Sequence, residues 1–410
     1  SQLNTIIAND VQDPQIALTC TTGITDMNQL FSIDFEDNVV SFNQNLEHWD
    51  ISNVTDLSFM FFSASSFNQP LNNWDVSNVN DMSGMFHSAD SFNQPLNNWD
   101  VSSVTDMSAM FLGADSFNQP LNNWDVSSVT DMSAMFKSAD SFNQSLNMWD
   151  VSNVTDMSSM FSNADSFDQP LNSWDVSSVI DMEQMLATNS FNQPLNNWDV
   201  SNVTDMSGMF ILAISFNQPI DNWDISSVTD IDAMFSGASS FNQPLNNWDV
   251  SNVTDLRFMF NSASSFDQPL NNWDVSNVTF MNNIFANATS FNQDISDWCV
   301  EQIPTQPVGF AFNSPLQASF FPEWGATCTL GLAENSLDNF KVYPNPVEEQ
   351  LNIFWSSVNF SDEMSLQIYS LNGKRIFSES YSQRPSEINV SQLASGVYLL
   401  KVNSGGQSAV

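Results

Sequence analysis

The sequence predicts an α/β repeat solenoid followed by a small all-β domain, and three observations support this fold class. The first is a segment that recurs through most of the chain, with its tryptophan at residues 49, 74, 99, 124, 149, 174, 198, 223, 248, 273 and 298. Every step is 25 residues except the 24 residues from Trp174 to Trp198. A period of this size is typical of a solenoid, in which each turn buries its apolar face on the next.

The second observation is the pattern within one repeat. Residues 73–77 alternate polar and apolar, which predicts a short strand with Trp74 and Val76 pointing inward. Apolar residues then recur at helical spacing over 82–89, which predicts a short helix with Asp81 as its N-cap. The spacing of leucine, tryptophan and valine also matches a leucine-rich repeat. Stacked strands would form a parallel sheet along one face.

The third observation is a change of pattern near the C-terminus. Short alternating or apolar runs are separated by turn signals, which predicts a small immunoglobulin-like antiparallel sandwich. These runs are residues 351–355, 365–369, 376–380, 387–390 and 397–402. The expected divisions are an N-terminal cap over 1–40, the solenoid over 41–298, a C-terminal cap over 299–330, a linker over 331–340 and the β-domain over 341–410.

The composition is strongly acidic, and the charge is unevenly placed. The formal net charge is −40, from 7 basic and 47 acidic residues. Residues 340–410 hold five basic and six acidic residues, so nearly all of the negative charge lies before them. Such a surface repels nucleic acid and anionic membranes, and it favours cations and basic partners. No apolar run is long enough for a membrane helix.

Cysteine usage and the first residue both fit an exported protein. Cys299 and Cys328 flank the segment after the last repeat, which suits one disulfide bond at that end, and Cys20 would stay free. The numbering begins at Ser1 without an apolar leader, as expected of a chain numbered from a cleavage site.

The sequence indicates no catalytic centre. The two histidines, His48 and His87, occupy unrelated positions in their repeats. No motif pairs a nucleophile with a base, and there is no phosphate loop or His/Cys metal cluster. Paired carboxylates are also not expected to act in catalysis, because the Asp columns repeat in every turn and no position is singled out. We therefore expect a protein that is not an enzyme.

Two columns of aspartates are the candidate functional residues. The first column lies at the predicted helix starts, where capping and the helix dipole explain it. It comprises Asp26, Asp56, Asp81, Asp106, Asp131, Asp156, Asp181, Asp205, Asp230 and Asp255, and Phe280 breaks it. The second column faces solvent between columns of Asn and Ser, and its candidate ligand-binding members are Asp75, Asp100, Asp125, Asp150, Asp175, Asp199, Asp224 and Asp249.

The second column raises an electrostatic problem with two solutions. Carboxylates about 4.8 Å apart repel by about 0.9 kcal/mol even at the dielectric constant of water. Hydrogen bonds to the flanking Asn and Ser would compensate for this repulsion. The alternative is calcium bridging adjacent turns, with Asp100, Asp125, Asp150 and Asp175 as the speculative ligands.

An apolar segment interrupts the usual polar connector at residues 211–214. It follows the one shortened repeat, so the extra side chains would either repack over that repeat or form an exposed contact patch. If they repack, replacing Leu212 and Ile214 by serine should destabilise the fold.

The repeat resembles the BspA-type (DUF285) repeats of bacterial surface proteins. The resemblance rests on Phe-Asn-Gln-Pro-Leu, Trp-Asp-Val-Ser and Val-Thr-Asp-Met-Ser-x-Met-Phe, and on the Trp298-Cys299 to Trp324-Gly325 ending. It implies an extracellular protein, in a family that includes adhesins.

The tail resembles the type A sorting domain of the type IX secretion system of Bacteroidota. The matching sorting-signal residues are Tyr343, Pro344, Asn345, Pro346, Gly373, Lys374, Gly396 and Tyr398. The resemblance implies handling by the outer-membrane translocon and its shuttle protein through residues 341–410, and a secreted or cell-surface location. The resembled domains end in a Lys-rich strand, whereas this sequence ends at Ser408-Ala409-Val410.

Together these observations predict a secreted surface-binding or adhesion protein. Its ligand, a protein or a glycan, would dock on the acidic Asn–Asp–Ser strand face, without nucleic acid and without membrane insertion. The alternative is a calcium-stiffened spacer or matrix protein that has no specific ligand.

Overall fold

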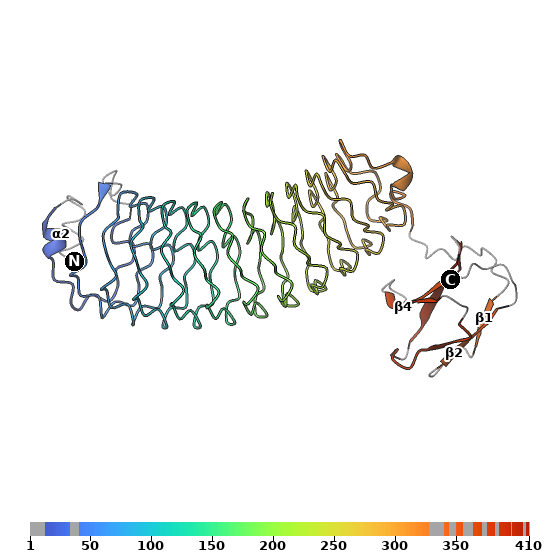
Figure 1. Cartoon of the computed structure of the whole chain (residues 1–410), viewed down its shortest axis with the longest axis horizontal. Coiled ribbons are helices and arrows are strands. Elements are labelled where there is room, and N and C mark those ends of the chain that lie inside the picture. The colour runs from blue at the N-terminus through green and yellow to red at the C-terminus, as the bar shows by residue number, and fades with distance from the viewer. Residues whose placement is uncertain are drawn as a thin grey trace. The chain divides into compact units, whose positions relative to one another are not determined.

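The computed structural model describes residues 13–32, 41–327, 340–343, 350–355, 364–370, 375–381, 385–394, 396–404 and 407–409. The chain divides into two compact units, Ser1–Trp324 and Gly325–Val410. In the first unit, coils of one repeat each are stacked in a single row (Figure 1). Its described residues also include the helix α2 (Gln15–Leu18) and the 3-10 helix η2 (Ala318–Phe320). No described helix is long and apolar enough to cross a membrane.

Each coil is built from turns, so the predicted strand and helix are both wrong. Residues 73–77 contain no strand and residues 82–89 contain no helix. Backbone hydrogen bonds close a series of tight turns instead, for example from Trp74 N–H to the Leu71 carbonyl at 3.0 Å. The inward direction of Trp74 and Val76 was predicted correctly, since they are only 3% and 1% exposed. The apolar spacing that suggested a helix is also the spacing of inward positions in this turn-rich coil.

Parallel pairing between coils does occur, but at residues 80–88 rather than at 73–77. We call residues 80–88 and their equivalents the ladder segment. Three or four N–H groups of each segment donate to carbonyls of the following coil. In one coil they belong to Met82, Gly84, Phe86 and Ser88, at 2.7–3.0 Å. These N–H groups bond between coils, and the N–H groups that alternate with them close tight turns, for example from Met85 N–H to the Met82 carbonyl at 3.2 Å. The segment therefore forms no α-helical hydrogen bonds. Asp81 is therefore not a helix cap. It lies on the bridge between coils, and its carboxylate accepts the Ser83 N–H at 2.8 Å.

Positive φ angles at two positions of the ladder segment direct alternate N–H groups to the same neighbouring coil. In one coil these positions are Gly84 (φ 57°) and Ser88 (φ 55°). When one coil has a bulky residue at one of these positions, the following coil can have a glycine at the equivalent position, which leaves space for the bulky side chain. The Leu212 side chain lies over Gly237, where an added Cβ would come within 2.7 Å of Leu212 Cδ2.

Away from the ladder segment, side chains make most of the hydrogen bonds between neighbouring coils. The Asn93 carboxamide oxygen accepts the Asn118 N–H at 3.0 Å and the Gln119 side-chain amide at 2.9 Å. The Trp124 indole N–H donates to the Leu96 carbonyl of the preceding coil at 3.0 Å. These bonds recur from coil to coil, which explains why Phe-Asn-Gln-Pro-Leu and the tryptophan repeat so closely.

The core of the solenoid is a set of aromatic stacks that run along the row of coils. Phe111 lies 5.6 Å from Phe136 in the next coil and 4.0 Å from Phe117 in its own coil, measured between ring centroids. The indole rings of Trp99 and Trp124 stack at 6.3 Å. All of these side chains are buried, so each coil covers the apolar face of its neighbour.

Both ends of the row depart from the regular coil. The ladder already begins at Asp26, which pairs with Asp56. It continues past Trp298, because Phe285 N–H donates to the Phe310 carbonyl at 2.9 Å. There the stacking changes direction, since Trp324 meets the Phe310 ring edge-on at 4.8 Å and closes the core.

Cysteines lie near both ends of the solenoid. Cys299 is disulfide-bonded, and Cys20 is a free, exposed thiol. Cys328, the partner expected from the sequence, lies outside the described residues.

The second unit contains two antiparallel sheets. One sheet has the order β1-β2-β5 and the other β4-β3-β6-β7. Their bounds are β1 Phe340–Tyr343, β2 Gln350–Trp355, β3 Met364–Ser370, β4 Arg375–Tyr381, β5 Glu387–Asn389, β6 Tyr398–Ser404 and β7 Gln407–Ala409. Buried Leu351 and Ile388 from the first sheet share one core with Leu366 and Val402 from the second. Five of these strands were expected, and the immunoglobulin-like topology stays a prediction.

Of the predicted sorting-signal residues, Tyr343 ends β1, Gly396 precedes β6 and Tyr398 begins it. The Tyr398 hydroxyl donates to the Ala394 carbonyl at 2.7 Å. The others, Pro344, Asn345, Pro346, Gly373 and Lys374, lie outside the described residues.

Candidate binding surfaces of the solenoid

The aspartates proposed as a binding strip lie on exposed turns, not on strands. We call the columns of Asn73, Asp75 and Ser77 the strip face. In one coil Asp125 Oδ1 accepts both the hydroxyl (2.6 Å) and the N–H (3.1 Å) of Ser127. The same pair of bonds forms at Asp75, Asp100, Asp150, Asp175, Asp199 and Asp249, and Asp224 accepts the N–H of Ser226.

These hydrogen bonds give the strip carboxylates a structural role. The Ser152 hydroxyl and then its N–H lower the pKa of Asp150, and Ser201 does the same for the pKa of Asp199. The bonds run within each coil, so every carboxylate closes a turn of its own repeat. Among the described residues, no group of three or more His, Cys, Asp and Glu side chains is arranged to hold a metal ion. The calcium ligands predicted at Asp100, Asp125, Asp150 and Asp175 therefore stay a prediction.

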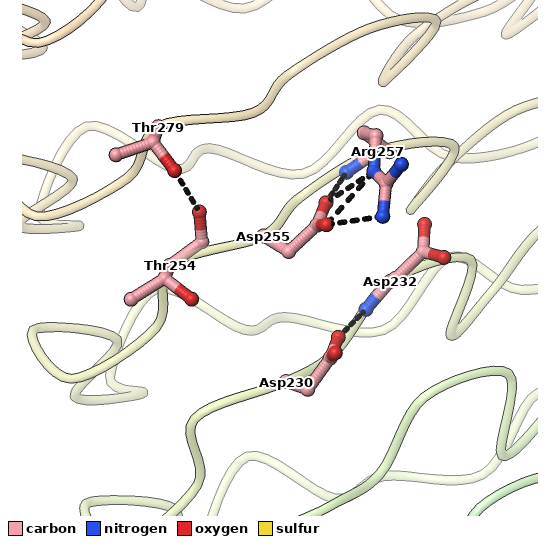
Figure 2. A network of polar contacts seen from close by, with 6 residues as sticks. All are labelled: Asp230, Asp232, Thr254, Asp255, Arg257 and Thr279. Carbon is pink, nitrogen blue, oxygen red and sulfur yellow. Dashed lines mark hydrogen bonds and ion pairs between the residues drawn. The ribbon is translucent and has the colours of Figure 1, made fainter.

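The other aspartate column runs along the ladder and is partly buried. Burial, and then the neighbouring carboxylates, raise the pKa of Asp181 and of Asp230. The column ends at Asp255, which pairs with Phe280 in the following coil. The end of this column coincides with a unique cluster of side chains, shown in Figure 2.

This cluster contradicts the expectation that no position is singled out. Arg257 forms an ion pair with Asp255. Its Nη2 lies 2.6 Å and its Nε lies 2.8 Å from Asp255 Oδ2. The Arg257 guanidinium also lies 5.3 Å from the centre of the Phe280 ring, within the range of a cation–π contact. In the preceding coil, Asp230 accepts the N–H of Asp232 at 2.9 Å.

Asp232 is the least satisfied carboxylate of the cluster. Its Oδ1 is buried and has no hydrogen-bond donor among the described residues. Burial, and then the nearby Asp255 carboxylate, raise the pKa of Asp232 to about 6. The positive charge of Arg257 lowers the pKa of Asp232, but Arg257 forms its ion pair with Asp255. Other coils place serine at this position, as at Ser133, Ser158 and Ser207, so the carboxylate is not needed to form a coil.

We expect Asp232→Ser to stabilise the full chain at pH 8. The folded-state pKa of Asp232 lies above its ordinary value of 3.8, so the charged form costs stability above about pH 6, and this cost disappears as the pH falls below 4. Allowing for partial exposure, the gain at pH 8 should be about 1 kcal/mol. Urea unfolding at pH 8 and pH 4 measures it.

Asp199→Ser is the matched control, because the pKa of Asp199 is lowered. Its charged form contributes stability above its ordinary pKa, and this contribution is lost at lower pH. Asp199→Ser should therefore destabilise the chain at pH 8 and matter less in acid. Equal pH profiles for the two variants would contradict both assignments.

A further row of carboxylates was missed from the sequence. Asp90, Asp115, Asp140 and Asp165 are exposed and follow one another in successive coils. Burial, and then Asp90, raise the pKa of Asp115, and Asp140 responds likewise to Asp115 and Asp165. The row ends where Asn189 donates to Asp165 at 2.8 Å, and the equivalent residue of the next coil is Ile214.

Leu212 and Ile214 of the apolar segment at 211–214 are exposed, so these two side chains do not repack over the shortened coil, whereas Ala213 is buried in the core. Leu212 is 56% and Ile214 is 46% exposed. Leu212 also has a positive φ of 57°, at a position that Ser88, Ser138 and Gly237 occupy in other coils. An exposed leucine in this conformation does not help the coil to fold.

Comparison of the coils separates two kinds of position. Side chains that join the coils hardly change: the tryptophan column is constant, and the Asn118 column holds only asparagine or aspartate over 43–292. The positions of the ladder segment between the core residues vary, and their side chains range from buried to exposed. One column reads Ser58, Ser83, Ser108, Ser133, Ser158, Glu183, Ser207, Asp232, Arg257, Asn282 and Val308, and another reads Phe62, His87, Leu112, Lys137, Ser162, Ala187, Ile211, Ser236, Asn261, Ala286 and Phe312. We call the surface formed by the columns of Asp106, Ser108, Ala109, Leu112, Gly113 and Asp115 the ladder face.

Comparison with known families agrees with this repeat architecture. A family described as "Mycoplasma protein of unknown function, DUF285" matches residues 6–121, 93–193, 171–256 and 213–319. These matches overlap and cover well over half of the chain. The chain belongs to the DUF285 family. The last match reaches beyond Trp298, in agreement with the ladder coil found there.

A second family, the secretion system C-terminal sorting domain, matches residues 341–410. This DUF285 protein is thus exported by type IX secretion, to the cell surface or the medium. Neither family is of a catalytic kind. A comparison with curated proteins and one with solved structures each found no match.

Proposed function

We propose that this protein is a non-enzymatic binding protein of the cell surface, and that its ligand docks on the ladder face. The sorting domain and the repeat family account for export and surface location. The observation that supports the docking face is the variation between coils. The side chains that join the coils are nearly constant, whereas those of the ladder face change in size and charge. Extended faces of solenoids are typical binding surfaces.

The strip face is the weaker candidate. Its carboxylates are the same in every coil and accept hydrogen bonds from the serine of their own turn. Their uniformity is therefore explained by folding alone. A ligand bound there would meet the same side chains at each coil, which gives little basis for recognition at one place.

The two faces can be compared in one binding experiment. The labelled full chain is applied to an array of glycans and extracellular-matrix proteins. A ladder-face variant combines Lys137→Ser, Leu212→Ser, Arg257→Ser and Phe280→Asp, each a residue that the same column has in another coil. A strip-face variant combines Asp125→Asn, Asp150→Asn and Asp175→Asn. We expect the ladder-face variant to lose at least tenfold in affinity and the strip-face variant to keep its affinity. The reverse result would assign the ligand to the strip face.

The calcium-stiffened spacer stays a separate hypothesis with its own test. Thermal unfolding of the full chain is followed in EDTA, in calcium and in magnesium at equal ionic strength. Because each strip carboxylate already accepts hydrogen bonds in its own coil, we expect the two cations to shift the midpoint equally. A rise specific to calcium that saturates would instead favour metal sites in the Asp columns.

A further inference from the structure

An exposed apolar patch lies beside the Asp232 cluster on the ladder side of the solenoid. Phe280 is 52% exposed, Phe258 is 39% exposed and Val308 is 78% exposed. The three residues belong to successive coils: Asp255, three residues before Phe258, pairs with Phe280, and Asn283 donates to the Val308 carbonyl at 3.1 Å. Contiguous exposed apolar side chains on a soluble protein mark a contact surface.

Folding does not require these side chains. In other coils the Phe280 position is aspartate. The Phe258 position is alanine at Ala109, Ala134 and Ala233, it is Gly, Ser, Gln or Asn in most other coils, and it is phenylalanine at Phe59. Phe258 has a positive φ of 56°, which a bulky side chain seldom adopts. The patch therefore breaks the repeat pattern without adding to the buried core.

The charges beside the patch indicate the chemistry of its partner. Arg257 is the one basic residue there, and its bonds to Asp255 neutralise that carboxylate. Within the described part of the chain, no ion pair joins Asp230 or Asp232 of the preceding coil to a basic side chain. Asp232 Oδ1 is a buried acceptor that has no donor among the described residues. A buried acceptor of this kind gains a charge-assisted hydrogen bond when a cationic donor reaches it.

We propose that this patch docks a protein segment in which a lysine or arginine stands next to large apolar side chains. The basic group would donate to Asp232, and the apolar side chains would cover Phe280 and Phe258. Aromatic residues and arginine are the side chains that most often dominate the energy of protein interfaces. This inference rests on the proposed function and adds the position of the site and the chemistry of the partner.

Selection from a peptide library tests the proposal. A phage library of 12-residue peptides is selected on the full chain, after depletion on a variant with Asp232→Ser, Phe258→Ala and Phe280→Asp. We expect selected peptides to place Lys or Arg beside Leu, Phe or Trp. A selected synthetic peptide should bind at least tenfold more weakly to Asp232→Ser and to Phe280→Asp than to the wild type. Circular dichroism melting checks that both variants are folded.

Asp224→Ser on the strip face is the matched charge control. It removes one carboxylate from the coil that also holds Asp230 and Asp232, so a general attraction to the acidic chain would weaken equally in both variants. We expect this control to bind the peptide as the wild type does. Equal weakening in Asp224→Ser, or selected peptides without a basic residue, would overturn the proposal.

Two other outcomes assign the patch to a different occupant. Self-association of the full chain that disappears in Phe280→Asp would assign it to a second copy. Loss of a glycan from the array in Phe280→Asp, together with failed peptide selection, would assign it to a sugar. Both outcomes overturn this inference, whereas the glycan outcome still supports binding by the ladder face. Unchanged array binding in the ladder-face variant would instead reject the proposed function itself.

Discussion

Phe136→Ala should lose about 3–5 kcal/mol of the free energy of unfolding, the usual cost of emptying an aromatic site in a core. The Phe136 ring stacks on Phe111 at 5.6 Å, on Phe161 at 5.7 Å and on Phe142 at 4.0 Å. Its removal therefore opens a cavity across three coils. Because each coil contacts only its neighbours, the damage should also separate the unfolding of the two halves. Urea unfolding followed by tryptophan fluorescence measures both effects.

Phe136→Leu is the control that the chain itself provides. Leu186 occupies the same position in its own coil and is fully buried. The leucine variant should therefore lose much less, about 1 kcal/mol. A loss in Phe136→Ala no larger than in Phe136→Leu would mean that the aromatic stack contributes little.

Asn118→Ala should cost about 2 kcal/mol, because it leaves two partly buried donors without an acceptor. Asn118 Oδ1 accepts the Asn143 N–H at 3.0 Å and the Gln144 side-chain amide at 2.9 Å. The nearby backbone bond from Ser141 N–H to the Asp115 backbone carbonyl at 3.1 Å does not supply an acceptor for these two donors. Thermal unfolding of the full chain measures the loss.

Asn118→Asp is the matched control, since it keeps the accepting oxygen. Asp168 makes the same two bonds in another coil, to Asn192 N–H at 3.0 Å and to the Gln193 amide at 2.9 Å. The aspartate variant should therefore melt close to the wild type. If it lost as much as Asn118→Ala, the role of Oδ1 as acceptor would be refuted.

The sequence predicted the solenoid but not the path of its backbone. The tryptophan period and the alternation around Trp74 and Val76 correctly placed these side chains in the core. The helix prediction failed because the φ angles at the Gly84 and Ser88 positions are positive. The strand prediction failed because residues 73–77 form turns and the pairing between coils lies at 80–88. Periodicity of apolar residues cannot detect these angles, since it reports only which side chains point inward. Repeated Ser, Gly and Asn at the second position, the column of Ser88, were the available signal.

The side-chain bonds between coils also left a signal in the sequence. Asparagine, glutamine and tryptophan recur in nearly every copy, although two of them are polar. Their repetition indicated satisfied hydrogen bonds rather than a solvated surface. The partners, such as the Leu96 carbonyl for Trp124, could not be predicted without the register of neighbouring coils.

The Asp232 cluster shows that residues unique to one coil are hard to recognise in a repetitive sequence. The aspartate columns are nearly uniform in the sequence, and the break at Phe280 does not by itself identify the residues around it. Arg257, Phe258 and Asp232 depart from the common residue of their columns within two adjacent coils. Only the coil register shows that these departures meet at one place.

The most direct test of ligand binding by the ladder face is to block each face of one coil separately. Ser207 on the ladder face and Ser201 on the strip face lie in the same coil, and each hydroxyl donates to its own aspartate at 2.7 Å. In a Cys20→Ser background, Ser207→Cys or Ser201→Cys is coupled to a bulky maleimide polymer. Binding of the labelled full chain to its array ligand is then measured. If the ligand docks on the ladder face, the polymer at residue 207 abolishes ligand binding and the polymer at residue 201 does not. Binding that survives at 207 and fails at 201 would contradict docking on the ladder face.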